Sequence, residues 1–67
     1  MHDQVNICDL AFGELEAFVT GELGLPRFRT LQIWQWIWRR NARAFDDMTD
    51  IAKDVRVRLA ERCRIVW

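Results

Sequence analysis

The stretch PRFRTLQIWQWIWRR, residues 26–40, constrains the fold more than any other part of this chain. Its large apolar side chains recur at spacings of three and four, which is typical of an α-helix with one apolar face. On a helical wheel these side chains share one broad arc, formed by Leu31, Ile33, Trp34, Ile37 and Trp38. We therefore predict a helix from about Phe28 to Arg40 whose apolar arc lies in the core.

The other side of this predicted helix is basic and carries one tryptophan. It holds Arg29, Gln32, Trp36, Arg39 and Arg43, with Arg40 beside them. Arginine pairs bidentately with phosphate and stacks on bases, and RNA-binding proteins combine such contacts with aromatic rings. The same residue types also suit the solvated face of an amphipathic helix. The residues alone leave both interpretations open.

Three side chains of this stretch have alternatives of their own. Trp36 packs at the edge of the core beneath arginine stems, stacks on a base, or contacts another domain. Gln32 either caps a neighbouring loop through a hydrogen bond or contacts a base. For Phe28 we expect an anchoring role, with the ring holding the preceding loop in the core.

The segment AFGELEAFVTGEL, residues 11–23, predicts another amphipathic helix. Its apolar stripe is formed by Phe12, Leu15, Phe18, Val19 and Leu23. Gly24 and then Pro26 should end this helix. Ala11 is a poor N-cap, so we expect Asp9 or water to satisfy the first backbone N–H groups.

The last third of the chain predicts a short helical turn and then a third helix. Asn41 should end the preceding helix, and AFDDMTD, residues 44–50, should turn Phe45 and Met48 inward and its three aspartates outward. A helix from about Ile51 to Arg62 follows. Its apolar stripe is formed by Ile51, Val55, Leu59 and Cys63. No segment shows the sustained alternation that predicts a strand.

These elements predict an all-α fold, a small compact bundle of three main helices plus a short helical turn. A chain of 67 residues forms a single domain, and a domain this small buries only about 60% of the surface that its unfolded chain exposes. With 51% hydrophobic residues it has enough apolar surface for a core, but not for a deep catalytic cleft as well. We expect residues 9–64, approximately, to be ordered.

Charge is segregated along the chain although its formal sum is zero. Residues 1–25 carry five acids and no Lys or Arg, whereas residues 26–67 carry all ten basic residues and five acids, so the second segment has a net charge of +5. Segregated charge affects which partners a protein attracts. The change of sign coincides with the break at Gly24, Leu25 and Pro26.

The thiols and the lone histidine disfavour a disulfide framework, a metal site and a catalytic set. Cys8 and Cys63 lie far apart in the sequence, and His2 stands near the start. Disulfide frameworks and zinc sites need more cysteines or clustered ligands, so we expect two free thiols that are buried or half-buried. No signal peptide and no apolar run of about 20 residues is present, so we expect a cytoplasmic protein without membrane contact.

Two other charged clusters have ordinary structural interpretations. Basic residues of the last predicted helix alternate with Asp54 and Glu61, which favours ion pairs within the helix over a phosphate-binding surface. The three aspartates of residues 46–50 lack the ladder and the distal Glu of a calcium loop. We expect them to cap a helix instead.

Several short motifs occur together in a specific order and spacing. They are Asp9-Leu10, Phe28-Arg29, Gln32, Trp36, the run from Phe45 to Ile51 (FDDMTDI), and Lys53. From about Cys8 to Arg64 the chain resembles the amino-terminal region of RlmN-type radical SAM methyltransferases, which methylate C2 of an adenosine in ribosomal RNA and in certain tRNAs. Two capping positions depart from the pattern. The family often has Ser, Thr or Asn where this chain has Ala11, and Gly where it has Asn41.

The resemblance implies that the catalytic machinery lies elsewhere. The chemistry of such enzymes depends on a 4Fe–4S cluster held by a CxxxCxxC motif, on S-adenosylmethionine, and on a methyl-carrying cysteine. Cys8 and Cys63 match none of these positions, so we assign them no catalytic role. We expect residues 1–67 to be one accessory domain of a longer chain, helix-hairpin-helix-like in its packing and catalytically inert without the barrel domain.

Two functions from different classes follow. The first is an RNA-binding accessory domain that holds ribosomal RNA or tRNA for the catalytic domain of the same chain. Its candidate contacts are Arg27, Arg29, Gln32, Trp36, Arg39, Arg40, Arg43 and Lys53. The alternative is a domain that docks on the catalytic barrel and stabilises it without touching RNA. Its exposed apolar residues would be Trp36, Ile65, Val66 and Trp67. A DNA-binding module is disfavoured, because no glycine-bearing hairpin joins two helices.

Overall fold

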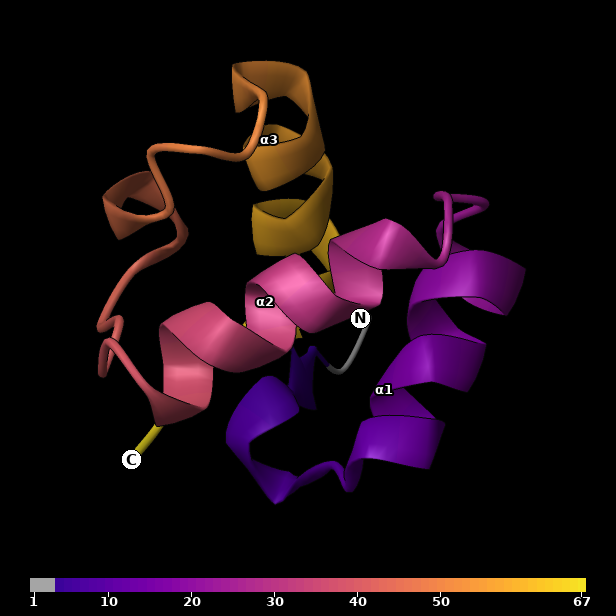
Figure 1. Cartoon of the computed structure of the whole chain (residues 1–67), viewed down its shortest axis with the longest axis horizontal. Helices are drawn as coiled ribbons and strands as arrows, with labels where there is room; N and C mark the ends of the chain where they lie inside the picture. The colour runs from indigo at the N-terminus through magenta and orange to yellow at the C-terminus, as the bar shows by residue number, and fades with distance from the viewer. Residues whose placement is uncertain (1–3) are drawn as a thin grey trace.

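The computed structural model describes residues 4–67 as three helices around one core. Along the chain the helices are α1 (Phe12–Ala17), which runs on as a π-helical segment over Phe18–Glu22, α2 (Phe28–Trp38) and α3 (Lys53–Arg62). A 3-10 turn at Phe45–Asp47 precedes α3. In Figure 1, α2 lies across the front of the molecule, with α1 to its right and α3 above it. The predicted bundle of three main helices and a short turn is confirmed.

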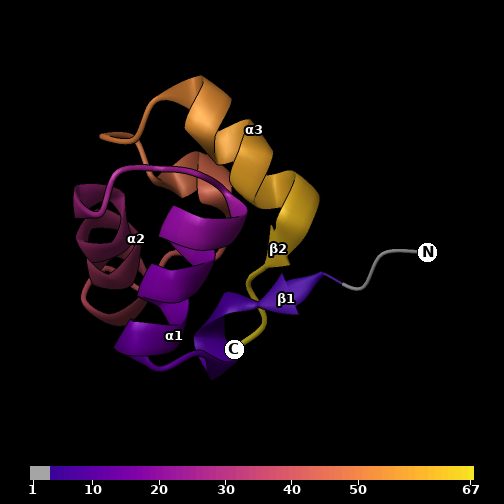
Figure 2. The same ribbon diagram turned by 90° about the vertical axis from the view of Figure 1, so that its right-hand side faces the viewer.

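The prediction that no strand forms is wrong, although the sheet is small. Strands β1 (Val5–Asn6) and β2 (Cys63–Arg64) pair in parallel, with Val5 opposite Cys63 and Asn6 opposite Arg64. The side chain of Asn6 extends the pairing, because its Nδ2 donates to the carbonyl of Val66 and its Oδ1 accepts from the Val66 N–H, both at 3.1 Å. The two strands lie side by side in Figure 2, where they join the two ends of the chain.

The first helix forms where predicted but changes its winding after Ala17. Leu23 N–H donates to the Phe18 carbonyl at 3.1 Å, five residues back, which widens the last turn. Gly24 then takes a φ of 64°, the left-handed conformation that ends helices and that glycine adopts without strain. At the other end, Ala11 N–H donates to Oε1 of Glu14 at 2.9 Å. Glu14 therefore contacts the residue that precedes the helix, and no side chain of Ala11 or Asp9 caps the first turn.

The second helix ends at Trp38, two residues before the predicted end. Asn41 takes a φ of 52°, as its predicted role as a helix stop requires, and Ala42 N–H donates back to the Trp36 carbonyl at 2.9 Å. Asparagine tolerates this left-handed conformation better than other residues with a side chain. The reversal directs the following loop toward the 3-10 turn and α3.

The buried arc of α2 is narrower than predicted and is rotated toward Trp36. Ile33 and Ile37 are buried as expected, and Thr30 is buried with them. Trp34 is half-buried. The expectations for Leu31 and Trp38 are wrong, because these side chains are 50% and 45% exposed.

The same rotation leaves Phe28 57% exposed, so this ring does not anchor the loop as expected. Neighbouring elements cover only one side of α2, and the small Thr30 side chain lies in the middle of that contact.

The core draws on all three helices, on the 3-10 turn and on β2. Its largest fully buried side chains include Ile7, Leu15, Ile33, Ile37, Met48, Ile51 and Leu59. Phe45 and Met48 point inward as predicted, whereas Asp46, Asp47 and Asp50 are exposed. Among residues 4–67, no helix is both long and apolar enough to cross a membrane.

Candidate nucleic-acid interface

One partly exposed stripe along α2 and the turn that follows it combines cations, an amide and an indole. Arg29 Nη1 donates to Gln32 Oε1 at 2.8 Å. One turn further along, the guanidinium of Arg40 lies 4.4 Å from the centre of the Trp36 ring. The stripe therefore brings together four of the predicted site residues, Arg29, Gln32, Trp36 and Arg40. Gln32 accepts from a neighbour on its own helix instead of capping a neighbouring loop, which was one of the two roles predicted for it.

Trp36 is held by a residue from another element. Its ring is half-buried and packs against the core, and its Nε1–H donates to Asp50 Oδ1 at 2.6 Å. This matches the interpretation of a ring at the edge of the core beneath an arginine. Because Arg40 lies over the ring, the outermost planar group of the stripe is the guanidinium, and a base would stack on it rather than on the indole.

Three predicted cations keep their charged groups unpaired. Within residues 4–67 the side chains of Arg39, Arg43 and Lys53 make no hydrogen bond or ion pair, and all three residues are exposed. Arg39 follows the last residue of α2, Arg43 lies in the next loop, and Lys53 begins α3. Unpaired cations of this kind can bind phosphate without breaking a contact of the fold.

Arg27 belongs to a different contact. Its Nε donates to Glu16 Oε2 at 2.8 Å and so links the start of α2 to α1. Such a surface ion pair contributes little to stability, but it occupies the guanidinium with an acid of the protein. Arg27 is the one predicted site residue that the described structure places in an ion pair.

The arginines of α3 contact other elements instead of the acids of their own helix. Arg58 Nη2 donates to the Leu23 carbonyl, Arg56 Nη1 donates to the Asp46 carbonyl at 3.1 Å, and Arg62 Nη2 pairs with Glu22 at 3.3 Å. The expected pairs with Asp54 and Glu61 are absent from the described residues.

The aspartates of residues 46–50 act as expected for the entry to a helical turn. Asp47 Oδ2 accepts from the backbone N–H groups of Arg43 and Ala44 at 3.1 and 3.3 Å. Asp50, by contrast, contacts Trp36. That contact joins residues fourteen positions apart, and no local pattern in the sequence signals it.

The thiols have the surroundings of structural cysteines. Cys63 is buried, and burial raises the pKa of its thiol from 9.0 to about 11, although Arg62 opposes the shift. Burial also raises the pKa of the half-buried Cys8. A raised pKa disfavours the thiolate, which is the nucleophile and the metal ligand. Within the described part of the chain no three His, Cys, Asp or Glu side chains are placed to hold a metal ion; His2 lies outside it.

Comparison with known proteins finds similarity over almost the whole chain. The model of the ribosomal RNA large subunit methyltransferase N-terminal domain matches residues 5–65. The dual-specificity RNA methyltransferase RlmN of Nitratidesulfovibrio vulgaris is 56% identical over 63 residues, which are 94% of this chain and 17% of that protein. The enzyme of the same name from Oleidesulfovibrio alaskensis is 48% identical over 63 residues, again 94% of this chain and 18% of that protein.

The similarity extends to three dimensions. A crystal structure of a radical SAM methyltransferase from Sphaerobacter thermophilus superimposes with a TM-score of 0.86 at 35% identity. The match covers 92% of this chain and 18% of that one. The chain thus spans less than a fifth of the length of the relatives it matches.

Proposed function

The chain belongs to the ribosomal RNA large subunit methyltransferase N-terminal domain family, and on that premise we propose that it binds RNA for the catalytic part of a radical SAM methyltransferase. The relatives are named dual-specificity RNA methyltransferases. The longer protein would accordingly be a cytoplasmic enzyme that methylates adenosine in ribosomal RNA and tRNA. The domain itself would hold the substrate and take no part in the chemistry.

The exposed stripe of α2 is the observation that carries this proposal. Guanidinium groups at Arg29 and Arg40 lie on one face, and the unpaired cations Arg39, Arg43 and Lys53 extend the charge beyond it. RNA is recognised through phosphate contacts and through bases stacked on aromatic and guanidinium planes. The stripe supplies both, with the plane of Arg40 supported by the Trp36 ring.

The proposed enzyme would use a 4Fe–4S cluster and S-adenosylmethionine, and the residues of this chain do not fit the cluster. A cluster needs several thiolates at short range, whereas Cys63 is buried with a raised pKa and no cluster of potential ligands exists among residues 4–67. We therefore assign both cofactors to the part of the relatives' length that this chain does not span.

A second candidate function rests on a different observation. An apolar strip on the other side of α2 exposes Phe28, Leu31 and Trp38, and Val66 and Trp67 are exposed as well. Large exposed apolar surfaces typically mark contacts between proteins. This surface would suit docking on the catalytic domain. Of the residues first considered for docking, Trp36 and Ile65 are half-buried and contribute less.

An NMR titration of the labelled chain with a tRNA, at 50 and 250 mM salt, separates the two functions. If about three phosphates are contacted, the fivefold rise in salt should weaken binding roughly 30- to 80-fold. Amide shifts should gather at Arg29, Gln32, Trp36, Arg39 and Arg43. Absence of shifts at both salt concentrations would contradict RNA binding and leave docking as the better account.

A further inference from the structure

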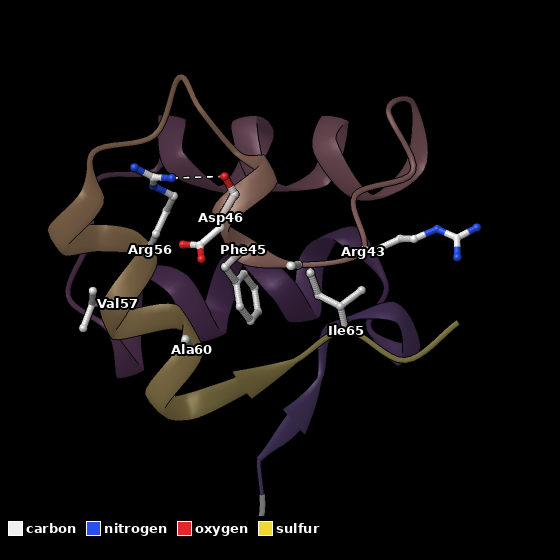
Figure 3. A pocket seen from close by; sticks show the side chains of 8 residues that line it. Arg43, Phe45, Asp46, Arg56, Val57, Ala60 and Ile65 are labelled. Atoms are coloured by element: carbon white, nitrogen blue, oxygen red, sulfur yellow. Dashed lines mark hydrogen bonds between the residues drawn. The ribbon is translucent and has the colours of Figure 1, made fainter.

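A hollow on another part of the surface is not explained by either function. It has a volume of about 300 Å³ and lies between the 3-10 turn, α3 and the segment after β2. Figure 3 shows it from close by. Its lining residues are Arg43, Ala44, Phe45, Asp46, Arg56, Val57, Ala60 and Ile65. Arg43 was predicted to contact RNA and Ile65 to contact the catalytic domain, and the other lining residues were not predicted to take part in a site.

The walls of the hollow are apolar and open to solvent. Phe45 forms the inner wall and is itself buried, while Val57 is 49% exposed at the opening. Ile65 contributes a branched side chain, and the small Ala44 and Ala60 leave the opening wide. Ligand sites in proteins have volumes from about 300 Å³ upward, so a single planar ring fits this space.

The rim of the hollow is charged in a way that selects the ligand. Arg56 and Arg43 lie on two sides of it in Figure 3, with Phe45 and Ile65 between them, and the Arg43 side chain points outward from the hollow. The guanidinium of Arg56 is held in place because its Nη1 donates to the Asp46 carbonyl at 3.1 Å. Its Nε–H is buried and has no acceptor within residues 4–67, so a ligand could contact this guanidinium only through its terminal nitrogens.

Asp46 adds a carboxylate to the same lining. A carboxylate repels phosphate, but it accepts hydrogen bonds from the exocyclic amino group of a base. These features match the parts of one nucleotide. The apolar space suits the ring of the base, the carboxylate suits its amino group, and the two arginines suit the neighbouring phosphates. An apolar side chain of a protein would make no use of either arginine.

We propose that this hollow holds one unpaired nucleotide of a bound RNA. The base lies against Phe45, Val57 and Ile65, and the flanking phosphates contact Arg43 and Arg56. The proposal rests on the proposed function, because it assumes that RNA is bound. It deepens that function by assigning a preference for RNA with an extruded base, whereas the α2 stripe contacts any RNA backbone. Arg43 belongs to both surfaces and connects them.

The test compares two short RNA duplexes that differ by one nucleotide. One is fully paired and the other carries a single bulged adenosine, which has an exocyclic amino group. Base stacking contributes about 1–3 kcal/mol to such contacts, so the bulged duplex should bind the labelled chain at least about fivefold more tightly. The additional NMR shifts should appear at Phe45, Val57, Ala60 and Ile65.

Two variants block the hollow without touching the core. Ala60→Trp fills the space from an exposed position, and Val57→Glu places an acid at its opening. Each variant should abolish the preference for the bulged duplex. Ala60→Trp should also leave the affinity for the paired duplex unchanged. Ala17→Trp, at an exposed position on α1, is the matched control and should retain the preference.

Each other result has a distinct meaning. Equal affinity for both duplexes, unchanged by Ala60→Trp, would overturn the nucleotide site. RNA binding through α2 would not be affected by that result. Failure of both duplexes to bind at 50 mM salt would overturn the proposed function and this site together. Shifts at Val57 and Ile65 on addition of a separately expressed catalytic domain, with none on addition of the bulged RNA, would assign the hollow to a protein contact and contradict the proposal.

Discussion

The arginines of α3 and the arginines that follow α2 are used in opposite ways. On α3, Arg56 and Arg58 donate to backbone carbonyls of other elements, and Arg62 pairs with Glu22. At the end of α2 and beyond it, Arg39 and Arg43 make no such contact within the described residues, and Arg40 lies over the Trp36 ring. The contacts of each guanidinium therefore separate Arg58 and Arg62, which hold the fold, from Arg39 and Arg43, which are available to a ligand. Arg56 does both, because it donates to the fold and also lines the hollow.

The largest expected effect tests the structural side of this comparison. Arg58→Ala removes a charged donor from the Leu23 carbonyl at the end of the α1 region, and hydrogen bonds of this kind contribute about 2 kcal/mol. Urea unfolding followed by tryptophan fluorescence should show that loss. Arg64→Ala, at an exposed position on β2, is the control and should leave the midpoint unchanged. Equal midpoints for both variants would contradict the role given to Arg58.

The next effect concerns Cys63, which directly follows α3. Its pKa is about 11 in the folded chain against 9.0 without burial, so the folded state keeps a proton that the unfolded state loses. This stabilisation is fully present below pH 9 and is lost as the pH rises toward 11. At pH 10 the free energy of unfolding should be lower by about 1 kcal/mol than at pH 8.

The comparison of Cys63→Ala with the unchanged chain isolates this effect from other titrations. Unfolding by urea at pH 8 and pH 10 should show a smaller decrease for the variant. An identical decrease in both proteins would mean that the Cys63 thiol ionises in the folded state as readily as in the unfolded one.

A smaller effect on stability is expected for Asp50, which contacts the Trp36 ring of the α2 stripe. Asp50→Ala removes the acceptor of the Trp36 Nε1–H and should lower the free energy of unfolding by about 1 kcal/mol or less. It also removes a negative charge beside the α2 stripe, so RNA affinity should not fall. Asp54→Ala, also exposed, serves as the control for the change in charge. A loss of RNA affinity specific to Asp50→Ala would show that the indole must be fixed for binding.

The smallest effect on stability is expected for the unpaired cations. Arg39→Ala should change the free energy of unfolding by less than about 0.5 kcal/mol, as is usual for surface substitutions without partners. Thermal unfolding by circular dichroism can measure this. A clear destabilisation would place Arg39 with the structural arginines of α3 and weaken the comparison between the two helices.

The helices themselves could be predicted from local patterns. Apolar spacing located α2, the positive φ values of Gly24 and Asn41 occur at the two predicted stops, and Phe45 and Met48 are buried as their positions suggested. Each of these features depends on residues within one or two turns of each other. Local sequence is therefore sufficient for them.

Features that depend on distant residues could not be predicted in the same way. Strands of two residues are too short for an alternating pattern, and β1 and β2 come from opposite ends of the chain. The exposure of Trp38 depends on which side of α2 the other elements cover. Likewise, Arg56 acquires its place at the hollow only because α3 packs beside the 3-10 turn. The sequence could therefore predict which helix face carries the candidate site. It could not predict which of the basic side chains there are paired with other residues of the fold and which are unpaired.

The most direct test of the account compares two double charge reversals with equal change in net charge. Arg39→Glu with Arg43→Glu alters the unpaired cations beyond α2, and Arg62→Glu with Arg64→Glu alters exposed cations at the end of α3 and on β2. The measurement is the affinity of each folded variant for the same tRNA at 50 mM salt. We predict a loss of roughly tenfold or more for the first pair, from about two phosphate contacts, and a much smaller loss for the second. Equal losses would mean that binding follows net charge alone and would contradict a specific RNA-binding surface on α2.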